Sequence, residues 1–383
     1  MVVASRIKGI EFVRGCRLAV SVSPIDVDDS TPKDFYRRSH ERTIVAMTGT
    51  SLDVEVVPRM VEEILGGRRV VDVKAAEEGT DDVFFVTVEM PSTSRECVLK
   101  ACSFVDPPAF RVEPRVIDLV SRRTEIPVPD VFGYVDDHDD LPAPFFLMGR
   151  APGEQISGPE SLTDDALERT ANDAGRHLGE LHSAASFDGY GWFRAGVDVD
   201  GEPTVGDLAV ADPAEDLPSA LRRSVEDGFE RIEETRFSDI LGDLRAGLDT
   251  HLDAVPADPE PVLIHADYRF GNLLIDPETG AVRTVLDWGN PSTGHSEYDL
   301  VQTEQYLCGR LPLDADRRHL VRNALEAGYG ETNDLSRDEG FDAVRHAYFF
   351  ITQLWPLAWF DLWYGEDDEI AEQQRTLMQS LLP

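Results

Sequence analysis

The sequence predicts an α+β protein of two lobes, a small β-rich N-lobe with one key helix and a larger, mainly helical C-lobe. Short β-branched or aromatic runs, separated by Gly, Pro and Asp, fill the first part of the chain. After Pro152-Gly153, apolar residues recur at helical spacing instead. A chain of 383 residues has room for two compact lobes. We therefore expect an N-lobe over residues 47–150 and a C-lobe over residues 151–383.

The N-lobe is expected to open with a helix from Pro58, because apolar residues follow at helical spacing until Gly66-Gly67. A second helix is indicated where Val112 and Val116 share one face before Pro127. Five β-branched or aromatic runs predict strands, and this second helix lies between the third and fourth. The predicted strands are residues 70–73, 83–88, 96–101, 132–135 and 145–148.

In the C-lobe, an apolar stripe from Leu167 to Leu181 predicts a helix that Thr163 caps. Further helices are expected over about residues 216–254 and from 314 to the C-terminus. Two strand-like runs lie between these helical regions, at residues 262–264 and 282–286.

The formal charge of −37 is extreme, because self-repulsion of this size destabilises a compact chain unless counter-ions screen it. Only four of the 36 basic residues are lysines. Acidic excess with few lysines is similar to the composition of proteins from extreme halophiles, so we interpret it as adaptation to a salt-rich cytoplasm. An acidic surface for a cationic partner is the alternative. The charge argues against nucleic acid as a partner.

Residues 1–46 differ from the rest, since they carry eight basic and six acidic side chains. They are interpreted as an N-terminal extension, either a disordered regulatory arm or, as we favour, a mis-assigned start upstream of Met47.

The four cysteines, Cys16, Cys97, Cys102 and Cys308, lack C-x-x-C spacing and are expected to be free thiols in a reducing cytosol. No apolar stretch reaches the length of a membrane span, so we expect a cytoplasmic protein without a membrane partner.

The most informative motif is HADYRFGN at residues 265–272, followed by LDWG at residues 286–289. Phosphoryl transfer requires a carboxylate at the acceptor hydroxyl, together with an amide and a second carboxylate that hold magnesium on the phosphates. Asp267, Asn272 and Asp287 have this spacing. The pattern predicts Asp267 as the catalytic residue and Asn272 and Asp287 as metal ligands, with His265 supporting the loop.

This order of motifs resembles the aminoglycoside phosphotransferase family of small-molecule kinases, which includes choline kinase-like enzymes, over about residues 55–365. The resemblance implies a protein-kinase-like bilobal fold, ATP or GTP, and Mg²⁺. It leaves the acceptor open, since members phosphorylate antibiotics, choline, homoserine or sugars. A protein kinase is disfavoured because Asp287-Trp288-Gly289 leads to Tyr298-Asp299 without an Ala-Pro-Glu motif. The chain also lacks Walker A and Rossmann glycine motifs.

The resemblance also implies which residues would bind the nucleotide. Lys100, one of the few lysines, would bind the α- and β-phosphates, and Glu113 on the following helix would hold it. An edge-strand lysine and a solvated glutamate are the plainer alternatives. Gly79 and Thr80 would belong to the phosphate loop, although Asp81 and Asp82 would repel phosphates there unless they point outward or bind cations.

Three further expectations concern the hinge and the acceptor side. The backbone of Met148 would contact adenine, although a buried strand is an equal reading. Arg269 would stabilise the transferred phosphoryl group or pair with a nearby carboxylate. Asp299 is expected to cap a helix more than to contact the substrate, and the aromatic residues over 348–364 are expected to be core more than an amine pocket.

The sequence therefore predicts an ATP-dependent phosphotransferase that acts on a hydroxyl of a small metabolite. The alternative is a nucleotide-binding regulatory protein with the same fold and little or no transfer activity.

Overall fold

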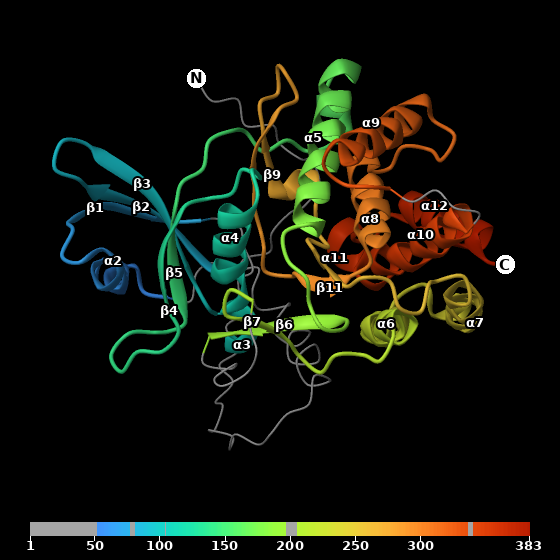
Figure 1. Cartoon of the computed structure of the whole chain (residues 1–383), viewed down its shortest axis with the longest axis horizontal. Coiled ribbons are helices and arrows are strands. Elements are labelled where there is room, and N and C mark those ends of the chain that lie inside the picture. Colours follow the sequence, from blue (N-terminus) through green and yellow to red (C-terminus); the bar gives the residue numbers. More distant parts are fainter. Residues whose placement is uncertain (1–51, 77–80, 104, 197–204, 336–339) are drawn as a thin grey trace.

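The computed structural model describes residues 52–76, 81–103, 105–196, 205–335 and 340–383 (Figure 1). The predicted extension over residues 1–46 lies outside these ranges. Within them, no helix combines the length and apolar character that crossing a membrane requires. Cys97, Cys102 and Cys308 are free thiols, as expected.

The N-lobe is built on a five-stranded sheet in the order β1-β2-β3-β5-β4, in which every neighbouring pair is antiparallel. The five predicted strands are confirmed with small changes at their ends. The strands are β1 (Val70–Ala75), β2 (Asp82–Glu89), β3 (Ser94–Ala101), β4 (Val131–Val135) and β5 (Phe145–Gly149). The helices are α2 (Val57–Leu65), α3 (Pro107–Phe110) and α4 (Val112–Arg123).

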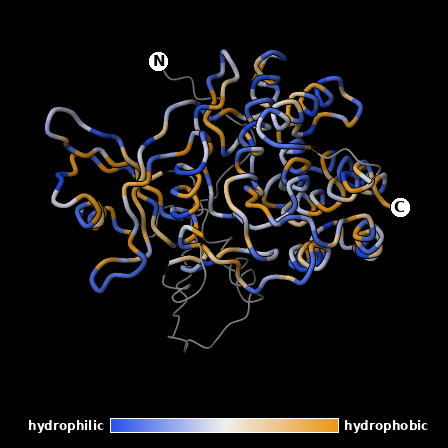
Figure 2. The backbone as a smooth tube through the Cα atoms, in the orientation of Figure 1, coloured by the Kyte–Doolittle hydropathy of each residue, from blue (hydrophilic) through white to orange (hydrophobic). Residues whose placement is uncertain are grey.

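The alternation of side chains along β2 explains how this sheet packs. Phe84, Val86 and Val88 are buried at every second position. They share a core with Val57 and Met60 of α2, the helix that the pattern after Pro58 predicted. Figure 2 shows the hydrophobic residues following this sheet and the hydrophilic ones gathering in its outer turns.

The C-lobe is mainly helical, as predicted. Its first helix is capped by Thr163, whose side chain accepts a hydrogen bond from the Ala166 amide at 3.3 Å. Helices α5 and α9 cross very closely at Gly175. A Cβ at this position would stand only 1.9 Å from the Leu325 carbonyl oxygen. The helices are α5 (Asp164–His182), α6 (Leu217–Glu233), α7 (Leu241–Leu252), α8 (Ser296–Cys308), α9 (Asp316–Thr332), α10 (Phe341–Ala358), α11 (Phe360–Tyr364) and α12 (Asp368–Leu381).

Short strands connect the helical part to the site. β7, β6, β11 and β8 form a four-stranded sheet in that order, and β9 and β10 form a hairpin. The sequence predicted only β8 and β10. The bounds are β6 (Gly191–Ala195), β7 (Leu208–Val210), β8 (Val262–Ile264), β9 (Leu273–Ile275), β10 (Val282–Val285) and β11 (Ser292–Gly294).

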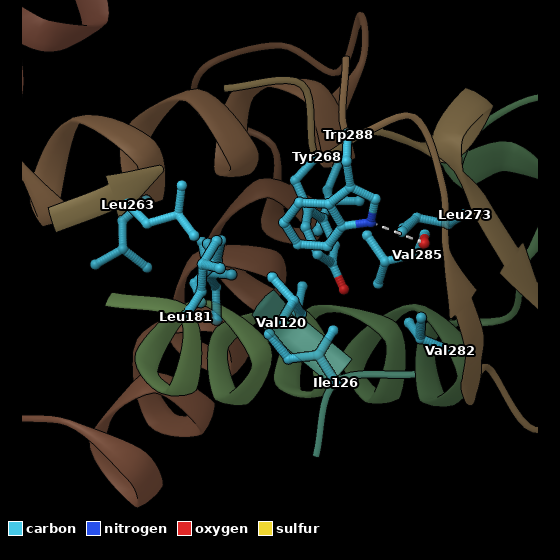
Figure 3. Packing of buried hydrophobic residues seen from close by; sticks show 14 of the residues in the cluster. Val120, Ile126, Leu181, Leu263, Tyr268, Leu273, Val282, Val285 and Trp288 are labelled. Atoms are coloured by element: carbon cyan, nitrogen blue, oxygen red, sulfur yellow. Dashed lines mark hydrogen bonds between the residues drawn. The ribbon is translucent and has the colours of Figure 1, made fainter. Parts of the chain in front are cut away.

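The two lobes share a hydrophobic core around α4. Val116 and Val120 of α4 are buried in the same cluster as Trp288 and Tyr268 of the C-lobe. Figure 3 shows Val120, Ile126, Tyr268, Val285 and Trp288 in this packed group. A helix of the N-lobe is therefore fixed against the segment that carries the LDWG motif.

Candidate active site

The HADYRFGN motif forms a loop that follows β8 and ends in a 3-10 turn, Phe270–Asn272. The Asn272 side-chain amide donates to the Asp267 carboxylate at 2.7 Å and to the Asp267 carbonyl at 2.9 Å. Arg269 Nε donates to the other Asp267 oxygen at 2.9 Å. Two side chains of the motif therefore hold the Asp267 carboxylate in one orientation.

A buried carboxylate behind the loop fixes its backbone. Both oxygens of Asp299 accept main-chain hydrogen bonds, from the amides of His265 at 2.9 Å and Ala266 at 3.0 Å. Ala266 has a φ of 60°, an unfavourable left-handed conformation for a residue with a Cβ. Asp299 therefore stabilises a strained turn directly before Asp267. The expectation that Asp299 caps a helix is wrong, because it lies inside α8, whose N-cap is His295.

A chain of buried polar groups orients Asp299 in turn. His182 Nε2 lies 3.3 Å from the Asp299 carboxylate, and its Nδ1 lies 3.1 Å from the Tyr329 hydroxyl. Burial alone would raise the pKa of Asp299, but the hydrogen bonds from His182 and the His265 amide outweigh burial and lower it.

His265 supports the loop, as predicted. Its Nδ1 accepts from the Asp267 amide at 3.2 Å, so its Nε2 carries the proton shared with the Leu286 carbonyl at 3.3 Å. Its ring packs against Trp288 with the ring centroids 4.4 Å apart. This links the HADYRFGN loop to the LDWG motif.

The β9–β10 hairpin brings Asp287 beside Asn272. The Leu286 amide donates to the Asn272 carbonyl at 2.8 Å, and Asp287 follows with a φ of 59°. The Trp288 indole anchors the turn by donating to the Val285 carbonyl at 3.1 Å (Figure 3). The Asp287 side chain is 41% exposed and its carboxylate is therefore accessible to a ligand.

Lys100 and Glu113 meet across β3 and α4, with Nζ 2.6 Å from Glu113 Oε2. The same ammonium lies 4.0 Å from Asp287 Oδ1, so both lobes converge here. Burial opposes the charge on Lys100, but the carboxylates of Glu113, Asp287 and Asp81 outweigh it and raise the pKa of Lys100. Lys100 is partly buried and paired with Glu113. This excludes the alternative that it is a solvent-exposed lysine on an edge strand.

The proposed phosphate loop is only partly visible, because Gly79 and Thr80 lie outside the described residues. The two acids that follow are buried and accept backbone hydrogen bonds. Asp81 accepts from the amides of Ser103 at 3.1 Å and Val105 at 3.4 Å, and Asp82 accepts from the Leu52 amide at 2.9 Å. Main-chain donors thus balance the charges whose repulsion of phosphates was expected.

Met148 lies on β5, where it pairs with Val98 of β3 and Val131 of β4 and is partly buried. The amide of the next residue, Gly149, donates to the Asp130 carbonyl at 2.8 Å, and that of Arg150 to the Glu96 carbonyl at 3.1 Å. This segment is therefore firmly seated in the sheet at the point where the chain leaves the N-lobe.

Burial raises the pKa of Asp267, with the Arg269 guanidinium opposing and Asp287 adding to the rise. A carboxyl group whose pKa is raised in this way is suited to accepting a proton from a hydroxyl.

Helix α8 brings two polar side chains near Asp267. The charges of Asp267 and Arg269 both act on the Tyr306 hydroxyl. Gln302, one turn earlier on α8, donates a hydrogen bond to that hydroxyl at 3.5 Å. Sequence reasoning missed both residues, although their spacing of four places them on one face of a helix. The predicted aromatic region is mostly core, because Tyr348 and Phe360 are fully buried, while Trp363 is 46% exposed.

Comparison with known proteins agrees with this geometry. A family model described as the phosphotransferase enzyme family, APH, matches residues 72–341. The chain therefore belongs to the APH phosphotransferase family, and the resemblance identified from its motifs is confirmed.

Solved structures of this class share the fold. A thermostable mutant of aminoglycoside phosphotransferase APH(4)-Ia, solved with ADP and hygromycin B, superposes with a TM-score of 0.57 at 16% identity, covering 85% of this chain and 98% of that one. APH(2")-IIIa with GDP and kanamycin gives 0.53 at 16% identity, covering 86% and 98%. A microcompartment-associated aminopropanol kinase gives 0.55 at 18% identity, covering 86% and 95%.

A curated relative matches over a shorter stretch. Acyl-CoA dehydrogenase family member 11 of Gallus gallus is 33% identical over 91 residues, which are 23% of this chain and 12% of that protein. The match spans only a small part of that protein's length.

Proposed function

We propose that this protein is a small-molecule kinase that moves the γ-phosphate of ATP, or of GTP, to a hydroxyl of a small metabolite. The observation that carries the proposal is the convergence of Lys100, Asp267, Asn272 and Asp287 from both lobes. Membership of the phosphotransferase family supports phosphoryl transfer, and the relatives solved with ADP or GDP support a nucleotide as donor.

On the nucleotide side, Lys100 would bind the α- and β-phosphates while Glu113 holds its ammonium in place. Gly79 and Thr80 would cover the phosphates, and the backbone at Met148 would contact the base. In this proposal residues 47–150 bind the nucleotide and residues 151–383 carry catalysis and the acceptor.

Asn272 and Asp287 fit a magnesium ion. The Asn272 NH₂ group is used by Asp267, which leaves its amide oxygen for a cation. No cluster of three or more His, Cys, Asp or Glu residues suited to a metal occurs in the described ranges. Two oxygen ligands are nevertheless enough, because Mg²⁺ in such sites completes its shell with phosphates and water. When bound, Mg²⁺ would neutralise charge on the β- and γ-phosphates.

Asp267 would orient the acceptor hydroxyl and take its proton as the oxygen bonds to phosphorus. Arg269, which is 46% exposed, is proposed to turn its guanidinium toward the phosphoryl oxygens as negative charge develops on them. The acceptor would lie beside α8, against Gln302 and Tyr306. Its hydroxyl would then face Asp267.

A comparison of wild type with Asp267→Asn tests the proposal. Both are incubated with Mg²⁺, ATP or GTP and a metabolite pool in concentrated KCl, the salt-rich medium that the composition favours, and products are identified by mass spectrometry. A phosphorylated product that forms only with wild type supports the proposal, while nucleotide binding by both shows that the variant is folded. Nucleotide binding without turnover by wild type would favour the regulatory alternative.

A further inference from the structure

Three arginines converge on a cavity in the C-lobe that the proposed reaction does not use. Arg318 and Arg322 come from α9 and Arg345 from α10, and the cavity of about 350 Å³ is also lined by Phe349 and Ser380. In Figure 1, α9, α10 and α12 lie on the side of the C-lobe away from the five-stranded sheet. The cavity shares no lining residue with the candidate active site.

One buried carboxylate, Glu304 of α8, serves two of these arginines. Arg322 donates to its Oε1 from both Nε and Nη2 at 3.2 Å, and Arg345 binds its other oxygen. Glu304 is 4% exposed. Both of its oxygens are thus engaged with Arg322 and Arg345.

Arg318 is the arginine that this arrangement leaves unsatisfied. It is 4% exposed, and its Nη2 donates to the Leu311 carbonyl at 3.0 Å. Its Nε and Nη1 are buried and have no hydrogen-bond partner in the part of the chain that the structure describes. Its guanidinium carbon also lies 6.0 Å from the Phe349 ring centroid.

The four charged groups form one cluster, since Arg318, Glu304, Arg322 and Arg345 all act electrostatically on the buried Cys308 thiol. The cavity lining itself holds three guanidinium groups and one carboxylate, that of Asp342. A buried guanidinium N–H without a hydrogen-bond partner is costly.

We propose that this arginine cavity binds a phosphate group, either free inorganic phosphate or the phosphate of a small metabolite. A guanidinium presents its N–H groups as a planar fork that matches the oxygens of a phosphate, and several forks around one cavity match its negative charge. The site is independent of the proposed kinase reaction.

Calorimetric titration of the nucleotide-free protein with inorganic phosphate, at fixed ionic strength in KCl, tests the proposal. Lys100→Met removes the cation of the nucleotide site and is expected to retain phosphate binding. Arg318→Gln is expected to weaken binding about 10- to 100-fold, the value of a lost charge-assisted hydrogen bond. Arg222→Gln, an exposed arginine paired with Asp249, is the matched control and should bind as wild type does.

A second arm uses glycerol 3-phosphate in place of inorganic phosphate. Tighter binding of the ester assigns the cavity to a metabolite, and equal binding assigns it to free phosphate. Binding that Lys100→Met abolishes, or that Arg318→Gln leaves unchanged in a folded protein, would overturn the proposal. Wild type without saturable binding would do so too, even if Arg318→Gln does not fold.

Discussion

The side-chain amide of Asn272 donates to the carboxylate of Asp267 at 2.7 Å, so the proposed metal ligand also positions the proposed base. The NH₂ group of the amide is used within the protein, and its oxygen is the proposed ligand of the metal. The metal-binding and base-positioning roles of Asn272 can be separated by substitutions that keep the size of its side chain.

Asn272→Asp places a second carboxylate beside Asp267. Like charges at this distance raise the pKa of the pair, so we expect kcat/KM at neutral pH to fall about 100-fold or more. The acid limb of the pH profile should move to higher pH. Steady-state kinetics between acid and alkaline pH check this, with Asn323→Asp, exposed on α9, as the control. An unshifted acid limb would contradict the arrangement.

Glu113→Gln removes the carboxylate that compensates the buried Lys100 ammonium. Because Glu113 is the largest influence that raises the pKa of Lys100, its loss lowers that pKa and frees the side chain. The KM for the nucleotide is expected to rise about 10- to 100-fold. Glu62→Gln makes the same change on an exposed face of α2 and should have no effect. A nucleotide KM equal to that of wild type would refute the proposed role of the pair.

Arg269→Gln separates the two readings of Arg269. Arg269 opposes the rise in the pKa of Asp267, so its loss should move the acid limb of kcat/KM to higher pH under either reading. If Arg269 also stabilises the transferred phosphoryl group, the alkaline plateau should fall about 10- to 1,000-fold. A plateau that stays at the wild-type value would leave Arg269 only as the ion-pair partner of Asp267.

Stability is expected to decrease as the pH falls from about 6.5 toward 4. Burial, with the nearby Arg176 charge, lowers the pKa of His177 to about 4, and its Nδ1 lies 2.8 Å from the Tyr268 hydroxyl. Between these pH values His177 is protonated in the unfolded chain and neutral in the folded protein. This difference lowers the free energy of unfolding by up to roughly 3 kcal/mol. His177→Gln should flatten the dependence of the urea-unfolding free energy on pH, whereas exposed His319→Gln should not. Equal slopes in all three proteins would rule out His177 as the cause.

The N-lobe was predictable because its strands alternate strongly, as β2 does, and are bounded by turn residues. A helix at Asp299 was expected, but the bounds of α8 were not predicted. Four consecutive buried polar residues, Gln302 to Gln305, interrupt the apolar spacing of its buried face and weaken the helical pattern. Strand β9 was missed because three residues directly after the motif give too short a pattern.

The site was predictable where chemistry and sequence spacing coincide, as for Asp267, Asn272 and Asp287. Asp299 was assigned the wrong partner, since its hydrogen bonds reach the His265 and Ala266 amides more than 30 positions earlier in the chain. The hydrogen-bond partners of Asp81 and Asp82 were not predicted either, because their main-chain donors come from separate segments. Contacts of this kind depend on tertiary packing, which local pattern does not encode.

The close crossing of α5 and α9 limits how this scaffold can be engineered. His182 at the end of α5 and Tyr329 on α9 meet at 3.1 Å, and through Asp299 they reach the loop of Asp267. That meeting depends on Gly175 and Gly328, where even a methyl group would collide with the opposite backbone. A library that aims at new acceptors can therefore vary the face of α8 near Tyr306, but it should leave these two glycines untouched.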